Sequence, residues 1–273
     1  MVQKGIGNMK YYVVSDIHGF YSQLVKALTK AGFFDETEPH KLIVCGDMMD
    51  RGSEAVKMQE FMLKLLEEDK LIFVRGNHED LLISMLGDLR KSRFGFYFGT
   101  SHHVSNGTWS TALQLTGVKD DDATENYEDF IKKVKATDFY KKLIPASVDY
   151  YETPNYIFVH GWIPCFTNKM PDWHTRGRSY AYNPRWRDAS KEDWNTARWF
   201  NGMQVAEEHH IIEPSKKIVC GHWHASFGHC AYEKKCAEFG ESADFTPYYG
   251  NGVIAIDGCT AYTNEVNCLV IED

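Results

Sequence analysis

Side chains that can bind a metal ion or transfer a proton follow five short apolar segments of this 273-residue chain. Carboxylate, imidazole and amide groups in one set suit manganese, iron or zinc rather than magnesium or calcium alone. The set is large enough for two ions, and a pair of cations is the usual arrangement for phosphoryl chemistry. Its members are Asp16, His18, Asp47, Asp50, Arg51, Arg75, Asn77, His78, His160, His222 and His224.

Asp47 is the carboxylate that we expect between the two ions. Cations about 3.5–4 Å apart repel each other, and a shared anion offsets that repulsion. Asp47 directly follows Gly46, whose backbone freedom lets the chain turn close to such a site.

The apolar segments that must position these residues are short and rich in Val, Ile, Tyr and Phe, which predicts buried strands rather than helices. They cover residues 11–15, 41–45, 71–74, 156–159 and 217–220. The carboxyl ends of strands in an α/β sheet converge on one crevice. The pattern therefore predicts that all five strand ends meet at one site.

Two further apolar segments, residues 253–256 and 267–272, close the chain. Asp257 and Gly258 lie near the turn between them, so we expect a terminal hairpin. In that arrangement Asp257 is a turn residue at a strand end and not a metal ligand.

Helical patterns alternate with the first three strands. Ser22 suits a helix N-cap, Gly32 suits a helix stop, and Glu79 suits the positive end of the helix that it begins. The order strand, helix, strand, helix, strand, helix predicts a parallel sheet with covering helices. The three helical segments are residues 22–32, 53–68 and 79–89.

Residues 91–150 and 165–210 differ in character from the rest of the chain. The first stretch has helical patterns but little strand signal, and the second is rich in Trp, Arg, His and Asn. Both are expected to be insertions over one end of the sheet, within a single catalytic domain that spans residues 1–273.

The bulk composition narrows the class of protein. Hydrophobic residues make up 43% and charged residues 25%, as in ordinary soluble globular proteins. A net charge of −8 argues against a non-specific nucleic-acid binder, so no stable nucleic-acid partner is expected. Neither a secretory signal nor an apolar run of membrane-spanning length is evident, which predicts a cytoplasmic protein with reduced thiols and no membrane partner. The oligomeric state stays open.

Three motifs carry a resemblance to a known family. "SDIHGFYSQL", "CGDMMDRGSE" and "VRGNHED" match the signatures DxHG, GDxxDRG and GNHE. With "FVHG" and "CGHWH" further on, the chain resembles the calcineurin-like metallophosphoesterase superfamily. Within it, the chain is similar to the phosphoprotein phosphatase family and its short bacterial and phage branch. The resemblance implies an α/β fold with central mixed β-sheets forming a β-sandwich, helices on the outside and the active site at the carboxyl ends of strands.

The resemblance also implies two divalent metal ions, most often manganese or iron, with zinc also suited to the ligands. A hydroxide bridging the two ions would attack phosphorus in line. His224 would be either a ligand of the first ion or a neighbour of the ligands. The first ion would be held by Asp16, His18 and Asp47, and the second by Asp47, Asn77, His160 and His222.

By the same resemblance, His78 is the general acid that protonates the leaving group, and Asp50 keeps it protonated and oriented. Arg51 would bind phosphate oxygens as a planar fork. Arg75 and Arg198 are further candidates for phosphate binding. Arg187 is the next candidate after Arg198. Apart from the resemblance, Trp194 and Trp199 flank Arg198 and are candidates for stacking on a nucleobase if the substrate is a dinucleotide.

The leading functional hypothesis is a metal-dependent phosphomonoesterase acting on phosphoserine, phosphothreonine or phosphotyrosine in proteins. One alternative is a symmetrical diadenosine tetraphosphate hydrolase, which uses the same core on a phosphoanhydride. A second is another metallophosphodiesterase or a nuclease, suggested by "GHWH". A non-catalytic scaffold is a further alternative, against which every core ligand position is filled. The partner is thus a phosphorylated protein or a small phosphorylated substrate.

Overall fold

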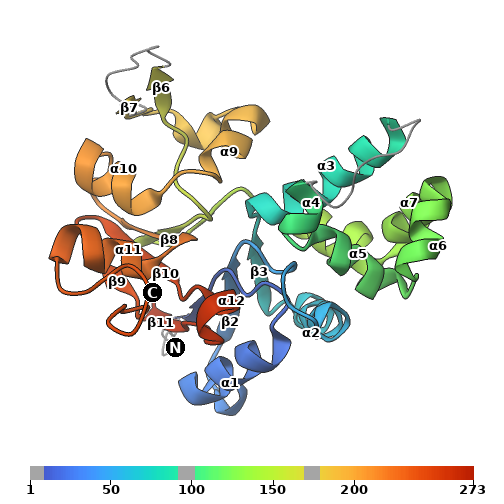
Figure 1. Ribbon diagram of the computed structural model, residues 1–273. Coiled ribbons are helices and arrows are strands. Elements are labelled where there is room, and N and C mark those ends of the chain that lie inside the picture. The colour runs from blue at the N-terminus through green and yellow to red at the C-terminus, as the bar shows by residue number, and fades with distance from the viewer. Residues whose placement is uncertain (1–8, 92–101, 169–178) are drawn as a thin grey trace, which may run out of the picture.

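The computed structural model describes residues 9–91, 102–168 and 179–273. Its centre consists of two mixed β-sheets (Figure 1). In the first sheet, β1, β2 and β3 run parallel and β11 pairs with β1 in the antiparallel sense. Across this sheet the strands are β11 (Leu269–Glu272), β1 (Lys10–Val14), β2 (His40–Cys45) and β3 (Leu71–Val74).

The second sheet has five strands, of which the middle three are parallel and the two outer ones antiparallel to their neighbours. A separate two-stranded ribbon pairs β6 (Phe166–Asn168) with β7 (Ser179–Ala181). Across the larger sheet the strands are β4 (Tyr151–Glu152), β5 (Tyr156–Phe158), β8 (Lys217–His224), β10 (Val253–Asp257) and β9 (Tyr248–Tyr249).

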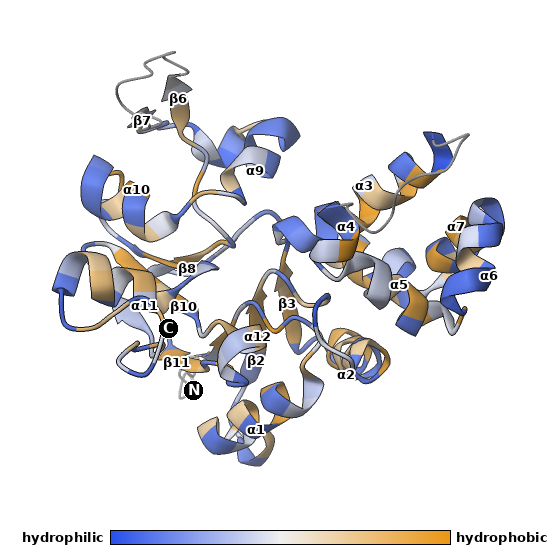
Figure 2. Cartoon of the chain, viewed as in Figure 1, coloured by the Kyte–Doolittle hydropathy of each residue, from blue (hydrophilic) through white to orange (hydrophobic). Residues whose placement is uncertain are grey.

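The two sheets share one apolar layer between them. Alternate side chains of a strand point to opposite faces. In β1, Tyr11 and Val13 join the layer between the sheets, while Tyr12 and Val14 pack in the outer core of the first sheet. Phe158, Val219 and Ile254 contribute to this layer from the second sheet. The other buried members of the layer are Ile43, Cys45, Val74, Ile256 and Ile271. Figure 2 shows the strands as predominantly hydrophobic segments. This arrangement confirms the predicted sandwich of mixed sheets.

Helices cover the outer faces of both sheets. The first three begin and end within two residues of their predicted bounds, and Gly32 ends the first in a left-handed conformation, as expected. The outer core of the first sheet also includes insertion residues such as Trp109 and Phe130. The helices on that side are α1 (Tyr21–Ala31), α2 (Ala55–Glu67), α3 (Asn77–Lys91), α4 (His102–Ser105), α5 (Thr108–Thr116), α6 (Asp120–Glu125), α7 (Tyr127–Ala136) and α8 (Ile144–Ala146).

The second sheet has its own outer helices, packed around Trp162, Phe200 and Met203. They are α9 (Lys191–Ala197), α10 (Gly202–His209) and α11 (Ala225–Gly228), while α12 (Thr260–Thr263) follows β10. Shorter helical turns occur at Phe33–Asp35, Phe139–Leu143, Trp186–Asp188 and His229–Glu233.

Two local predictions are wrong. Ser22 is not the N-cap of α1, because the helix already includes Tyr21 and the cap position is Phe20. Ser22 instead donates its backbone N–H and its hydroxyl to the Glu54 carboxylate, at 2.9 and 2.8 Å. An exposed helix end is therefore tied to the segment before α2.

The predicted terminal hairpin is also wrong, because β10 and β11 lie in different sheets. β10 pairs with β8, whereas β11 pairs with β1. The connection contains α12, and left-handed residues at Cys259 and Asn264 flank this helix. The chain therefore crosses from one sheet to the other instead of turning back on itself.

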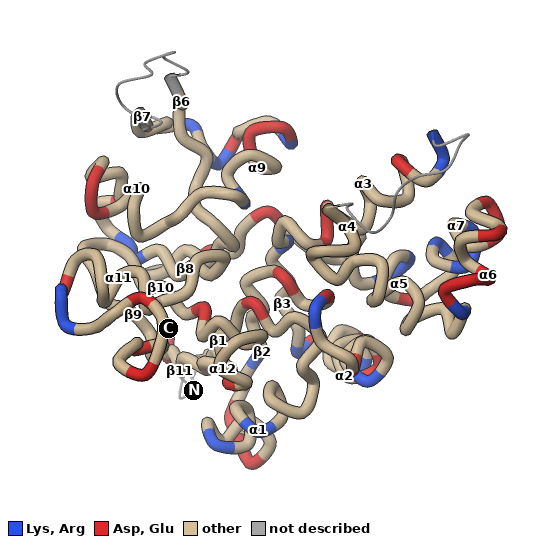
Figure 3. Tube along the Cα trace, viewed as in Figure 1, with Lys and Arg blue, Asp and Glu red and all other residues tan. Residues whose placement is uncertain are grey.

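The surface carries both signs of charge. Figure 3 shows Lys and Arg interspersed with Asp and Glu over α1, α2, α6 and α7. The expected absence of a stable nucleic-acid partner stays a prediction. Within the described ranges, no helix combines the length and the apolar character that crossing a membrane requires.

Candidate metal centre

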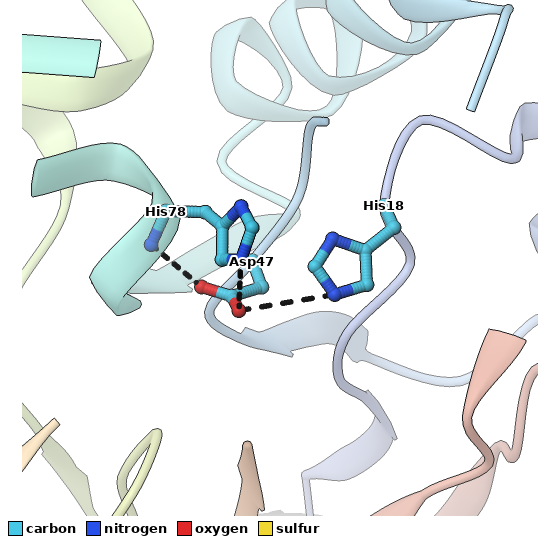
Figure 4. Close-up of side chains that lie close together, drawn as sticks. All are labelled: His18, Asp47 and His78. Atoms are coloured by element: carbon cyan, nitrogen blue, oxygen red, sulfur yellow. Dashed lines mark hydrogen bonds and ion pairs between the residues drawn. The ribbon is translucent and has the colours of Figure 1, made fainter. Parts of the chain in front are cut away.

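Two groups of potential metal ligands share Asp47. One consists of His18, Asp47 and His78, and the other of Asp47, His160 and His222. In each group, ligand atoms of all three residues lie within 4.8 Å of one another. Figure 4 shows the Asp47 carboxylate facing the side chains of both His18 and His78. Asp47 is the residue that the two groups share, and its role as a bridge between two ions stays a prediction.

Several residues of the candidate site have a strained backbone, near the carboxyl ends of strands from both sheets. Six of the eleven described non-glycine residues with positive φ belong to the candidate site, and such backbone costs about 1–3 kcal/mol per residue. Strain of this kind persists only where the surrounding structure imposes it, and it concentrates at functional sites. The six are Asp16, His18, Asp47, Asp50, Arg51 and His222.

Two glycines allow the loops to approach so closely. Gly46 has a φ of 81°, and a Cβ there would lie 2.4 Å from Nδ1 of His160. A Cβ on Gly221 would lie 2.1 Å from Oδ2 of Asp16. Both distances are far below van der Waals contact, so a side chain at either position would displace a candidate ligand.

The donor atoms of His160 and Asn77 meet as two ligands of one cation would. Nδ1 of His160 lies 2.8 Å from the carbonyl oxygen of Cys45, so this nitrogen must donate. Nε2 then carries a lone pair, yet it lies 2.7 Å from Oδ1 of Asn77, another acceptor. Burial lowers the pKa of His160, which disfavours a second proton on the ring. A cation bound by both atoms would satisfy the lone pair of each.

His18 has the same arrangement. Its Nδ1 lies 3.1 Å from the carbonyl oxygen of Met49, which leaves Nε2 as an acceptor 3.9 Å from Oδ2 of Asp47. Burial holds the pKa of the ring well below its usual range. A neutral imidazole that faces a carboxylate across such a gap is suited to a metal ion between them.

An excess of buried carboxylates gives the same indication. Burial, and then the charges of Asp257 and Asp47, raise the pKa of Asp16 well above its usual range. Asp16 Oδ2 accepts a hydrogen bond of 2.9 Å from the backbone N–H of His222. Carboxylates this close are stabilised in their ionised form by cations. The residues present therefore fit two divalent ions.

His78 belongs to the first of these groups and is also held in place by Asp50. Its Nδ1 lies 2.7 Å from Oδ2 of Asp50, and the hydroxyl of Thr108 donates to the same oxygen at 2.8 Å. Burial alone would lower the pKa of His78, but the charge of Asp47 and the bond to Asp50 outweigh it and raise the pKa. The other ring nitrogen lies 3.3 Å from Nη2 of Arg51, whose side chain is exposed.

Glu79 has a larger structural role than the predicted helix cap. Its carboxylate accepts from the backbone N–H of Gly76 at 2.7 Å, of Asp47 at 3.1 Å and of Met48 at 3.0 Å. It thereby joins the loop after β2 to the loop after β3. Burial and the charge of Asp47 raise its pKa to about 7. The motif identifies this glutamate, but its bonds to a loop 32 positions away are visible only in the structure.

We expect Glu79→Ala to destabilise the metal-free protein by more than about 3 kcal/mol, because three buried N–H donors lose their acceptor at about 1–3 kcal/mol each. Glu79→Gln is the matched control, since it retains one acceptor oxygen and should lose less. Urea unfolding of the metal-free protein measures both. Equal, small losses would show that the loops hold their shape without this carboxylate.

Asp257 lies at a strand end, as expected, but the sequence did not indicate that its side chain is buried. It is buried at the end of β10, where Oδ1 accepts a hydrogen bond of 2.7 Å from the backbone N–H of Cys259. Burial and the charge of Asp47 raise its pKa to about 7, against the lowering effects of that bond and of Arg51. The expected turn residue is thus a buried acid that faces the site.

The other predicted arginines are engaged in ion pairs. Arg198 is 2% exposed, and its guanidinium donates to Asp80 at 2.7 Å and to Asp149. Arg75 lies 3.7 Å from the same Asp80 carboxylate. The guanidinium of Arg187 is already engaged in ion pairs with Glu152 at 2.7 Å and with Glu213 at 3.3 Å. Phosphate binding by Arg75 or Arg198 stays a prediction.

His224 lies outside both ligand groups. Its Nε2 is 2.9 Å from a carboxylate oxygen of Glu238, and its ring packs beside Phe239. That contact favours the view of His224 as a neighbour of the ligands, and its role as a ligand stays a prediction.

The two tryptophans differ sharply. Trp194 is 3% exposed and stacks on Tyr150, so neither face is open to a substrate. Trp199 is 43% exposed, and its ring lies nearly perpendicular to that of His222, at 5.7 Å between centroids. Only Trp199 retains the predicted possibility of stacking.

Known proteins resemble parts of this chain. The asymmetrical bis(5'-nucleosyl)-tetraphosphatase PrpE of Bacillus velezensis is 29% identical over 138 residues, which cover 48% of this chain and 51% of that protein. The symmetrical bis(5'-nucleosyl)-tetraphosphatase of Buchnera aphidicola subsp. Schizaphis graminum is 32% identical over 90 residues, covering 33% and 32%. The chain thus spans about half the length, or less, of these curated relatives.

The fold also has solved counterparts. The cold-active protein-tyrosine phosphatase of a psychrophilic Shewanella species superposes with a TM-score of 0.51 and 16% identity, covering 98% of this chain and 76% of that one. The similarity shows a shared fold. In addition, the sequence model of the calcineurin-like phosphoesterases matches residues 9–226. Because that match takes in most of the chain, the protein belongs to the calcineurin-like phosphoesterase family.

Proposed function

We propose that this chain is a dinuclear-metal phosphatase that hydrolyses phosphomonoesters of proteins, with phosphoserine or phosphothreonine as the leading substrates and phosphotyrosine as a third. The observation that carries the proposal is the bond between His78 and Asp50, next to Asp47, the residue that both ligand groups share. When bound, two divalent ions such as manganese, iron or zinc would supply Lewis-acid activation of the phosphoryl group and of water.

The residues of the chain would divide the work as follows. Arg51 is exposed and adjoins His78, so it can bind the non-bridging oxygens of a phosphate that enters the site. In this proposal the first ion is held by Asp16, His18 and Asp47, and the second by Asp47, Asn77, His160 and His222.

His78 supports an ester substrate in particular. Cleavage of a phosphomonoester expels an alkoxide or a phenolate, and both need a proton at neutral pH. Cleavage of a phosphoanhydride expels a phosphate group, which needs a proton far less. A buried imidazole with a raised pKa, oriented by Asp50, suits the first reaction.

Hydrolysis of dinucleoside tetraphosphates is the second candidate. The named relatives act on such substrates, as their names state, and they share up to about half of their length with this chain. Two metal ions held by the candidate ligand groups would suit hydrolysis of esters and anhydrides alike.

The deciding experiment compares four substrates with the manganese-loaded protein: phosphoserine, phosphothreonine and phosphotyrosine peptides of one sequence, and diadenosine tetraphosphate. Release of phosphate and of nucleotides is measured, with Asp47→Asn as the blank. We expect the highest kcat/KM on a peptide. A clear preference for the dinucleotide would replace the phosphoprotein proposal with the second candidate.

A further inference from the structure

Trp199 is an exposed aromatic side chain at the edge of the metal centre. Of the exposed aromatic residues in the described ranges, it is the one whose ring contacts a member of the two ligand groups. The Trp199 and His222 rings are nearly perpendicular, at 84°. Because 43% of the Trp199 side chain is exposed, part of its indole ring is left for another partner.

His102 completes the surface. Its exposed ring lies 6.2 Å from that of Trp199, at an interplanar angle of 36°. His102 begins α4 in the first insertion, and Trp199 follows α9 in the second. The two insertions thus meet in a pair of aromatic rings next to a candidate ligand.

We propose that Trp199 and His102 bind the aromatic ring of a phosphotyrosine side chain and so favour aryl over alkyl phosphomonoesters. The inference rests on the proposed function and changes the order of its substrates, because it places phosphotyrosine before phosphoserine and phosphothreonine. Stacked and edge-to-face aromatic pairs at such distances are favourable beyond the area that they bury. The side chains of phosphoserine and phosphothreonine offer no ring to such a pair.

The proximity of Trp199 to His222 decides between two aromatic ligands. In phosphotyrosine, a single oxygen joins the ring to phosphorus, so a phosphorus atom at the metal centre brings the ring to the rim of that centre. In a dinucleotide, a whole ribose separates the base from the nearest phosphorus. A ring bound against Trp199 therefore fits an aryl ester better than a nucleobase.

Binding tests the proposal without turnover. The probes are phenylphosphonate and methylphosphonate, which differ in the ring and are not hydrolysed as esters, titrated calorimetrically into the manganese-loaded protein. Trp199→Leu should weaken phenylphosphonate about 10-fold and leave methylphosphonate unchanged. Trp199→Phe should recover most of the loss, because it retains an aromatic face. Tyr249→Leu, which removes an exposed aromatic ring on β9, is the matched control and should change neither.

Turnover provides the second arm. Trp199→Leu should lower kcat/KM about 10-fold on the phosphotyrosine peptide and leave the phosphoserine peptide unchanged. His102→Ala should lower it in the same direction. Equal losses on both peptides and both phosphonates would show that Trp199 merely supports His222, and would overturn the inference. Selective loss on diadenosine tetraphosphate alone would overturn it as well.

The two proposals fail separately. If the wild-type protein hydrolyses none of the esters but binds phenylphosphonate through Trp199, the proposed function fails and the ring-binding surface stands. If the protein hydrolyses the peptides and Trp199→Leu affects aryl and alkyl ligands alike, the proposed function stands and the surface does not.

Discussion

Asp47→Asn should reduce phosphatase activity to background and weaken manganese binding by more than about 100-fold. Changing groups that only orient a metal ligand already costs about 10–100-fold in affinity, and Asp47 is the residue common to both ligand groups. Its pKa is lowered because four surrounding histidines outweigh the opposing effect of burial. An amide has nearly the same shape but carries no charge to place between two cations.

Metal content after gel filtration, together with calorimetric titration of manganese, measures this effect. The backbone of the variant should stay intact, because the asparagine oxygen can still accept the hydrogen bond of 2.9 Å from the N–H of His78. Far-UV circular dichroism of the metal-free protein is the control. Retention of two ions per chain by the variant would contradict the bridging role of Asp47.

His78→Asn should leave both ions bound and lower kcat on alkyl phosphate esters by about 10²–10⁴-fold, the range for loss of one general acid. Asparagine can still donate to Asp50, so the local fold should survive. The loss should be smallest on an aryl phosphate with a nitro-substituted ring, because that leaving group hardly needs a proton. Release of the ions on this substitution would show that His78 is a ligand, as its place beside His18 and Asp47 also allows.

The pH dependence of kcat checks the same assignment. His78 acts when protonated, so activity on alkyl esters should fall as pH rises through its pKa, which lies above the ordinary 6.5. Burial opposes this direction, and the charges of Asp47 and Asp50 produce it. The descending limb should be absent in His78→Asn and weak on the nitro-substituted aryl phosphate.

The parts of the fold that local pattern decides could be predicted from the sequence. The short β-branched runs predict β1, β2 and β3 to within one residue, and the side chains that follow them do converge. Local pattern does not predict which strands pair with each other. Nothing within 253–272 distinguishes a hairpin from two strands that pair with β8 and β1. That choice depends on where the inward-facing side chains find a partner layer.

The contacts around the site could not be predicted from local pattern either, because they join residues that lie far apart along the chain. The role of Glu79 depends on backbone N–H groups in the loop after β2, and the ion pairs of Arg198 depend on Asp80 and Asp149. Each partner lies at least 31 positions away along the chain. Residue type and spacing identify which side chains can do chemistry, whereas only the packed insertions bring Trp199 against His102.

The apolar layer shared by the two sheets has a consequence for how the protein opens. Asp47 and Asn77 follow strands of the first sheet, while His160 and His222 belong to the second. Neither sheet can leave its partner without exposing that layer and separating these residues. Amide hydrogen exchange should therefore give β2 and β8 a single opening free energy, that of the cooperative unit. A bound divalent ion should raise the protection of both strands equally. Chelation should therefore lower the protection of β2 and β8, strands of different sheets, to the same extent.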